Sequence, residues 1–133
     1  MPLQIEIVTP EKRVAQISGA DEVRAPGVLG GFGIRPGHAS FISALDAGGL
    51  VVVQGGREEL FAVSGGFLQV EKDHVIVLAD TAEPKDEIDV EWAKKELAEA
   101  TERLRNMTEQ DQSYRIESAR VRRAAARLNV AGR

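Results

Sequence analysis

Residues 74–97 read HVIVLADTAEPKDEIDVEWAKKEL, and the character of the chain changes within this stretch. Up to Pro84, short apolar runs rich in Val, Ile and Gly alternate with turn residues, which is typical of β-strands. After residue 85 the chain has no proline, one late glycine, and a dense pattern of Ala, Glu, Arg and Lys. The sequence therefore predicts an α+β chain, with a β part over residues 1–84 and a helical part over residues 85–133.

The composition limits the functions that the chain can have. Its 133 residues fit one domain, or one domain with a small appendage, and its aromatic fraction of 5% predicts an aliphatic core. The absence of Cys excludes disulfides and thiolate chemistry, and the net charge of −4 does not favour nucleic acid as a partner. The first residues lack the pattern of a signal peptide, and no apolar run is long enough to cross a membrane.

The β part is expected to hold roughly eight to ten short strands, the number typical of sandwiches and barrels. Thr9–Lys12 and Lys72–Asp73 are turn signals, and Gly48–Gly49 is expected to separate two strands. The polar stretch Thr81–Asp86 is expected to be an irregular connection to the helices. This spacing predicts an antiparallel β-sandwich or barrel as the body of the protein.

The helical part contains two amphipathic segments joined by the polar stretch Thr108–Ser113. Asp89 is expected to cap the first helix. The first apolar stripe consists of Val90, Ala93, Leu97, Ala100, Leu104 and Met107. The second, weaker stripe consists of Tyr114, Val121, Ala124, Ala125, Leu128 and Ala131. The two helices are predicted to form an antiparallel hairpin that buries little area, so it needs the β part or a partner to lie against.

The two helical segments carry opposite charge. Residues 86–112 hold nine acids and four bases, whereas residues 114–133 hold six Arg and one acid. Arg120, Arg123 and Arg127 share one face of the second helix by their spacing. Two interpretations stay open: this face pairs with acids of the first helix (Glu96, Glu99 and Glu102), or it docks on an acidic partner or a polyphosphate.

The sequence offers only weak candidates for a catalytic or metal site. The run Gly30–His38 lacks the following helix and the Lys-Ser/Thr ending of a phosphate loop, so a tight β connection is expected. His38 and His74 are far apart in the sequence, which disfavours a metal site. Trp92 is expected to pack against the β part. The acids expected in a solvated linker and helix cap are Asp80, Glu83, Asp86, Glu87 and Asp89.

Four segments together resemble the epsilon subunit family of F-type ATP synthase, of the bacterial and chloroplast type. Residues 31–41, GFGIRPGHASF, are similar to its glycine-flanked loop. Residues 64–70, SGGFLQV, with residues 77–83, VLADTAE, resemble its second signature. The opening IVTP at residues 7–10 and the closing RLNVA at residues 127–131 also match. The resemblance covers nearly the whole chain and keeps the spacing of the motifs.

The resemblance implies a ten-stranded β-sandwich followed by a two-helix hairpin, in a rotor subunit that is not itself catalytic. The sandwich would contact the gamma subunit and the proton-driven c-ring. The hairpin would regulate ATP hydrolysis by meeting the catalytic alpha and beta subunits through Arg120, Arg123 and Arg127. The subunit would be peripheral, at the cytoplasmic face of the cell membrane. The loop implied to contact the rotor consists of Gly31, Phe32, Gly33, Pro36, Gly37 and His38.

Some members of this family bind ATP at the folded hairpin through a motif of the form Ile/Leu-Asp-x-x-Arg-Ala. The corresponding run here is Ile88-Asp89-Val90-Glu91-Trp92-Ala93, in which Trp92 stands where the motif has arginine. Glu83, Arg123 and Arg127 match the positions that accompany the motif. A Trp can stack on a base but cannot neutralise a triphosphate, so tight ATP binding and a resident cofactor are not expected.

Three other functions are weighed against this one. A free-standing β-sandwich adaptor would bind an acidic protein, and a small-molecule or nucleotide sensor would use the acids and arginines between the two parts. An enzyme is the least favoured, because no residue set indicates a nucleophile with its base. Co-purification with a gamma subunit and a catalytic hexamer would distinguish a rotor subunit from the adaptor and the sensor.

Overall fold

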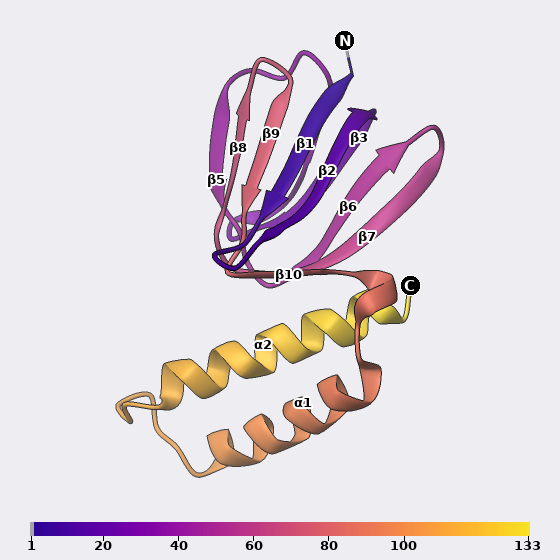
Figure 1. Cartoon of the computed structure of the whole chain (residues 1–133). Helices are drawn as coiled ribbons and strands as arrows, with labels where there is room; N and C mark the ends of the chain where they lie inside the picture. The colour runs from indigo at the N-terminus through magenta and orange to yellow at the C-terminus, as the bar shows by residue number, and fades with distance from the viewer. Residues whose placement is uncertain (1) are drawn as a thin grey trace.

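The computed structural model describes residues 2–133, in which a β-sandwich stands above a pair of helices (Figure 1). Ten strands form two sheets of five strands each, and two α-helices follow them in the chain. The predicted fold class is therefore confirmed, and the sandwich rather than the barrel is the observed form. No helix among residues 2–133 is long and apolar enough to cross a membrane.

The first sheet joins the hairpin of the first two strands to three later strands. In spatial order its strands are β2 (Arg13–Ala20), β1 (Leu3–Val8), β9 (His74–Leu78), β8 (Phe67–Glu71) and β5 (Phe41–Ala44). Neighbouring strands are antiparallel except β1 and β9, which run parallel from Gln4–His74 to Val8–Leu78. The one parallel pair was not predicted, because strands far apart in sequence give no local sign of their partner.

The second sheet contains segments that were expected to be irregular. In spatial order its strands are β10 (Thr81–Pro84), β7 (Arg57–Ser64), β6 (Gly48–Gln54), β3 (Glu22–Gly27) and β4 (Gly30–Ile34). The interpretation of Thr81–Asp86 as an irregular connection was wrong, because β10 pairs with β7 along the sheet edge. The interpretation of Gly48–Gly49 as a break was also wrong, because these glycines pair with Val63 and Ala62 in the interior of the sheet.

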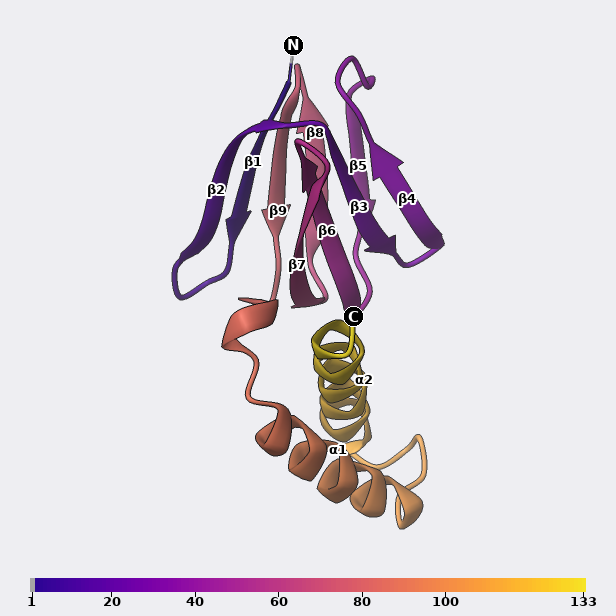
Figure 2. The ribbon, with the colours of Figure 1, turned by 90° about the vertical axis from the view of Figure 1, so that its right-hand side faces the viewer.

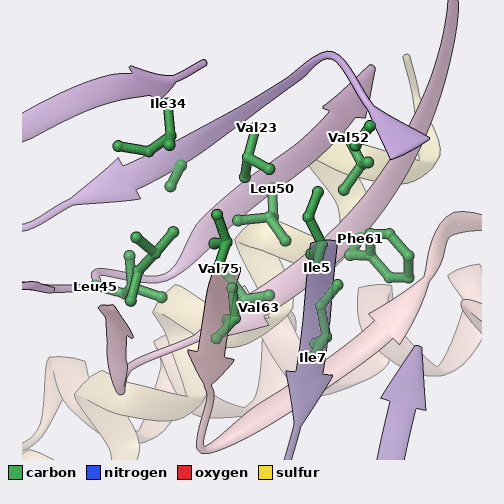
Figure 3. Close-up of a cluster of buried hydrophobic side chains, with 14 of the residues drawn as sticks. Ile5, Ile7, Val23, Ile34, Leu45, Leu50, Val52, Phe61, Val63 and Val75 are labelled. Carbon is green, nitrogen blue, oxygen red and sulfur yellow. The ribbon is translucent and has the colours of Figure 1, made fainter. Parts of the chain in front are cut away.

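The core between the sheets is aliphatic, as the composition predicts (Figure 3). Side chains from both inner faces meet there, and Phe61 is its one fully buried aromatic residue among those described. Other fully buried core residues are Leu3, Ile5, Ile7, Ile34, Leu50, Leu68, Val23, Val52, Val63, Val70 and Val75. This core draws on both sheets, with Leu45 and Ala79 beside the strands, and on no residue of either helix.

The short turns behave as predicted from their residues. Thr9 N–H donates to the Lys12 carbonyl at 2.9 Å, which closes the turn between β1 and β2. Lys72 and Asp73 have φ values of 49° and 63°, in the left-handed region that a two-residue hairpin turn requires. These turns set the register of the strands that carry the core residues.

The helical part begins with the short 3-10 helix η1 (Lys85–Glu87), followed by α1 (Val90–Arg105) and α2 (Tyr114–Ala131). Asp89 caps α1 as predicted, because its Oδ1 accepts the Trp92 backbone N–H at 3.0 Å. The two helices form the predicted hairpin, and α2 lies between α1 and the sandwich (Figures 1 and 2).

The helix α2 contacts the strands β6 and β7, and its buried residues differ from the predicted stripe. Ala124 is buried as predicted, but Ala125 is exposed, and Ala126 and Val130 are buried instead. The prediction considered one apolar face, whereas α2 packs against α1 and against the sheet at the same time. A Cβ atom at Gly49 of β6 would lie 3.2 Å from Val130 Cγ2, so the absence of a side chain there admits the helix.

Candidate functional site at the junction of hairpin and sandwich

The charged groups predicted to matter lie together where the hairpin meets the sandwich. We name this set the junction cluster: Glu83 of β10, Trp92 and Glu96 of α1, and Arg123 and Arg127 of α2. The β10 strand, the first turns of α1 and the last turns of α2 bring these residues to one place. In this structure two members of the arginine face, Arg123 and Arg127, pair with carboxylates of the chain itself.

Arg127 is the centre of the junction cluster. Its Nε donates to Glu83 Oε1, and its Nη1 donates to Glu96 Oε2 at 3.2 Å. Its side chain is only 15% exposed, and that of Glu96 only 10%. The charge of a mostly buried guanidinium between two carboxylates is compensated. Removing one partner from such a buried pair is costly, because the group that remains is left in the interior with its charge uncompensated.

Arg123 shares the same carboxylate from the other side. Its Nη2 donates to Glu96 Oε1 at 2.7 Å, so each oxygen of Glu96 accepts from a different arginine. Arg123 Nε is buried and has no hydrogen-bond partner among the described residues. Glu96 therefore joins two turns of α2 to α1, a role that its place on the acidic face alone did not single out.

Trp92 does not pack against the β part as predicted. Its side chain is 51% exposed, and the Arg127 guanidinium lies over its ring at 5.3 Å from the centroid. An arginine over an indole ring is a favourable cation–π arrangement. Trp92 follows Asp89 by three residues in the first turn of α1, which directs it toward α2 instead of the sheet.

The other residues matched to the ATP motif surround the cluster without entering it. Ile88 is half-buried before α1, Asp89 is occupied as the helix cap, and Ala93 is fully buried. The structure brings Glu83, Arg123 and Arg127 together, with Glu96 between the two arginines.

Arg120 behaves differently from the other two arginines. Its Nη1 donates to Glu117 Oε1 at 3.3 Å within α2, and Glu117 also pairs with Arg103 of α1 at 3.4 Å. Of the acids named in the first of the two open interpretations, only Glu96 pairs with the arginine face. Glu99 and Glu102 instead face Arg103 and Arg105 on their own helix.

The segment implied to contact the rotor is not one loop. Gly31, Phe32 and Gly33 belong to the edge strand β4, and only Pro36, Gly37 and His38 lie in or beside a turn. Figure 2 shows this turn at the end of the sandwich far from the helices. Gly37 N–H donates to Asp73 Oδ1 at 2.7 Å, which ties the turn to the β8–β9 hairpin. The His38 ring packs edge-on against Phe41, at 5.5 Å between centroids.

An apolar row on the outer face of the first sheet was missed. The register aligns Ala44, Phe67, Leu78 and Val8 across four strands, and Phe67 and Leu78 are about half exposed. Ile42, also exposed, lies in the next row. The sequence did hold a signal: the unbroken apolar run HVIVL of β9 puts apolar residues on both faces, which is typical of a strand covered on both sides.

A groove with a volume of about 980 Å³ lies between α2 and the outer face of β3, β4 and β6. Its lining residue Arg24 is already paired, since it donates to Glu58 at 3.0 Å and to Glu22 at 3.2 Å. These hydrogen bonds, first that with Glu58, raise the pKa of Arg24. Within residues 2–133, no cluster of His, Cys, Asp and Glu could hold a metal ion.

Known proteins match this chain along its whole length. The family model for the ATP synthase, Delta/Epsilon chain, beta-sandwich domain matches residues 2–85, and that for its long alpha-helix domain matches residues 86–132. The ATP synthase epsilon chain of Anaeromyxobacter sp. (strain K) is 61% identical over 133 residues, covering 100% of both chains. That of Myxococcus xanthus (strain DK1622) is 49% identical, covering 97% of this chain and 94% of the relative.

Two solved structures share the fold. A chain in the cryo-EM structure of Euglena gracilis mitochondrial ATP synthase has a TM-score of 0.81 at 23% identity, covering 99% of this chain and 82% of that one. A chain in the central stalk and c-ring of Tetrahymena thermophila mitochondrial ATP synthase has a TM-score of 0.63 at 17% identity, covering 96% and 93%. The family matches and the curated relatives agree with the motifs in the sequence, so the chain belongs to the ATP synthase delta/epsilon chain family.

Proposed function

We propose that this chain is a central-stalk subunit that couples rotation of a c-ring to ATP synthesis and restrains ATP hydrolysis through its helices. As an epsilon-type chain it is a non-catalytic subunit of ATP synthase. Residues 1–84 would bind the rotor, and residues 85–133 would regulate. The subunit would be held at the cytoplasmic face of the membrane through the complex.

The way in which the hairpin attaches to the sandwich carries the regulatory half of this proposal. The sandwich core contains no helical residue, and α2 lies against β6 and β7 with the small buried side chains Ala126 and Val130. An interface of this kind adds little apolar burial, because alanine contributes a single methyl group. The hairpin can therefore leave the sandwich without exposing the core.

The apolar row supports the rotor half of the proposal. Phe67, Leu78 and Ile42 lie on the first sheet, whereas α2 contacts β6 and β7 of the second, and they are 53%, 50% and 66% exposed. Large apolar groups gathered on one exposed face favour a protein partner. We propose that this face adds to the contact of the 31–38 segment with the gamma subunit and the c-ring.

In this proposal the arginine face has two sets of partners. In the folded hairpin Arg123 and Arg127 meet Glu96 and Glu83. In an extended hairpin the same arginines, with Arg120, would meet acids of the catalytic alpha and beta subunits and restrain hydrolysis. A state change requires only that the two sets of contacts be similar in free energy.

A single engineered disulfide tests this proposal, because the chain has no native Cys. Gly49→Cys with Val130→Cys places one Cys on β6 and one on α2, where a Cβ at Gly49 would be 3.2 Å from Val130 Cγ2. In the assembled complex, oxidation should abolish the inhibition of ATP hydrolysis, and reduction should restore it.

Each single-Cys variant is the control for this experiment. Equal inhibition in the oxidised and reduced double variant would show that the hairpin does not need to leave the sandwich. Failure of the chain to co-purify with gamma and the catalytic hexamer would overturn the rotor assignment itself.

A further inference from the structure

The arginines that the family resemblance assigns to ATP are already neutralised in this chain. A nucleotide triphosphate needs cations whose charge is not already compensated, and unpaired guanidinium groups supply such cations. Here Arg127 donates to Glu83 and Glu96, and Arg123 donates to Glu96. Trp92 stands where the motif has a third cation. The residues present therefore do not fit a bound triphosphate in the folded hairpin.

Glu96 occupies the position that an anion bridging Arg123 and Arg127 would take. Its two oxygens accept from Arg123 at 2.7 Å and from Arg127 at 3.2 Å, and its side chain is 10% exposed. An anion that binds both arginines would have to displace this carboxylate and leave it partly buried without a partner. Such a displacement is unfavourable because an unpaired buried charge carries its full desolvation penalty.

Trp92 closes the remaining side of Arg127. The guanidinium lies 5.3 Å from the centroid of the indole, while its edge is used by the two glutamates. One face of the indole ring is thus occupied by the chain's own cation. Trp92 stabilises the folded hairpin through this contact with Arg127. A nucleotide at this position would compete with the contact.

We propose that Glu96, together with Glu83 and Trp92, takes the place of a nucleotide in this chain and holds the hairpin folded without ATP. The inference rests on the folded state of the proposed regulatory hairpin, and it adds that nucleotide is not the signal that moves it. Glu96 is the residue on which the arrangement depends, because it alone contacts both arginines from α1.

Hydrogen–deuterium exchange on the full-length chain tests this proposal, with α2 as the readout and the core strands as the internal reference. The chain is measured with and without millimolar Mg-ATP or tripolyphosphate. The native chain should show the same α2 protection in all three conditions. Glu96→Ala should lower α2 protection by at least about tenfold, as expected when a partly buried pair loses one partner.

The diagnostic result is rescue by polyphosphate. Glu96→Ala frees Arg123 and leaves Arg127 with Glu83 as its carboxylate partner. Mg-ATP or tripolyphosphate should therefore restore part of the α2 protection in that variant alone. Glu96→Gln keeps the shape of the side chain but not its charge, so its α2 protection should lie between that of the native chain and that of Glu96→Ala. Glu99→Ala is the matched control, because Glu99 is on the same helix and only approaches Arg103, at 3.9 Å.

The proposal is overturned if Mg-ATP increases α2 protection in the native chain, or if Glu96→Ala behaves like Glu99→Ala. It is also overturned if Glu96→Ala loosens α2 and polyphosphate restores nothing. All of these readings use the isolated chain, whereas the proposed rotor role is tested by co-purification with gamma. Failure of one proposal is therefore distinguishable from failure of the other.

Discussion

Arg123 of α2 donates to Glu96 of α1 at 2.7 Å across the helical hairpin. Arg120, one turn earlier, instead donates to Glu117 of its own helix at 3.3 Å. The arginine face predicted from the sequence therefore divides into residues that hold the hairpin folded and one that does not. This division allows the folding of the hairpin and its docking on partners to be tested separately.

Replacing Arg120, Arg123 and Arg127 together by Ala should relieve the inhibition of ATP hydrolysis in the assembled complex, because the proposed docking face is lost. Truncation after Glu87 should relieve it at least as much. The measurement is the ATPase rate at low and high salt, since exposed charge pairs are screened by salt. Arg120→Ala alone should reduce inhibition while leaving the contacts to Glu96 intact. Equal rates for all variants would show that the helices are not inhibitory.

A fragment that ends at residue 84 should fold and bind the gamma subunit. Every residue of the hydrophobic core lies between Leu3 and Ala79, so the fragment keeps the whole core. Thermal unfolding followed by circular dichroism should remain cooperative and β-rich. An unfolded fragment would show that α2 contributes to the core through β6 and β7.

Gly33→Val should weaken the coupling of proton flow to ATP synthesis more than it lowers the free energy of unfolding. Gly33 lies on the edge strand β4, and an added Cβ would come within 3.1 Å of the flexible Glu22 side chain, which can move. A β-branched residue suits a strand, so the fold should tolerate it. Coupling is measured in reconstituted vesicles, and normal coupling in an assembled variant would remove this segment from the rotor contact.

Phe67→Gln combined with Leu78→Gln should weaken binding to gamma without destabilising the sandwich. Both side chains are half exposed on the outer face, and substitutions at such positions usually change stability by about 0.5 kcal/mol or less. Binding is measured by titration with the purified gamma subunit. Gln69→Ala, from the same face of β8, is the control. Unchanged affinity in the double variant would show that gamma does not use this face.

Trp92→Arg should raise the affinity of the isolated chain for ATP, because it restores a cation at the motif position and removes the ring under Arg127. The gain should be larger when Glu96→Ala is added, since Arg123 is then unpaired and Arg127 keeps only Glu83. Calorimetric titration with Mg-ATP measures both. Micromolar binding by the native chain, unchanged by either substitution, would contradict the role given to Trp92 and Glu96.

Much of the fold could be predicted from local pattern alone. Period-two apolar runs and turn residues predicted the strands, and Asp89 before a helical stripe predicted the start of α1, because these signals act through neighbours in sequence. The motifs also predicted the family, which the family matches confirm. Gly48 and Gly49 of β6 gave the wrong local answer, because close packing against Pro26, Val130 and Arg133 explains them and a turn does not.

The sequence by itself determined a β part, a helical hairpin, the polarity of the two helices and the residue types available at their junction. Only the tertiary structure decided that β1 inserts beside β9, that α2 buries two faces, and that Glu96 pairs with Arg123 and Arg127. Composition fixes which charges exist, but their partners depend on distances between elements far apart in the chain. The same holds for the apolar row of Phe67 and Leu78, which becomes a surface only when β-strand register aligns it.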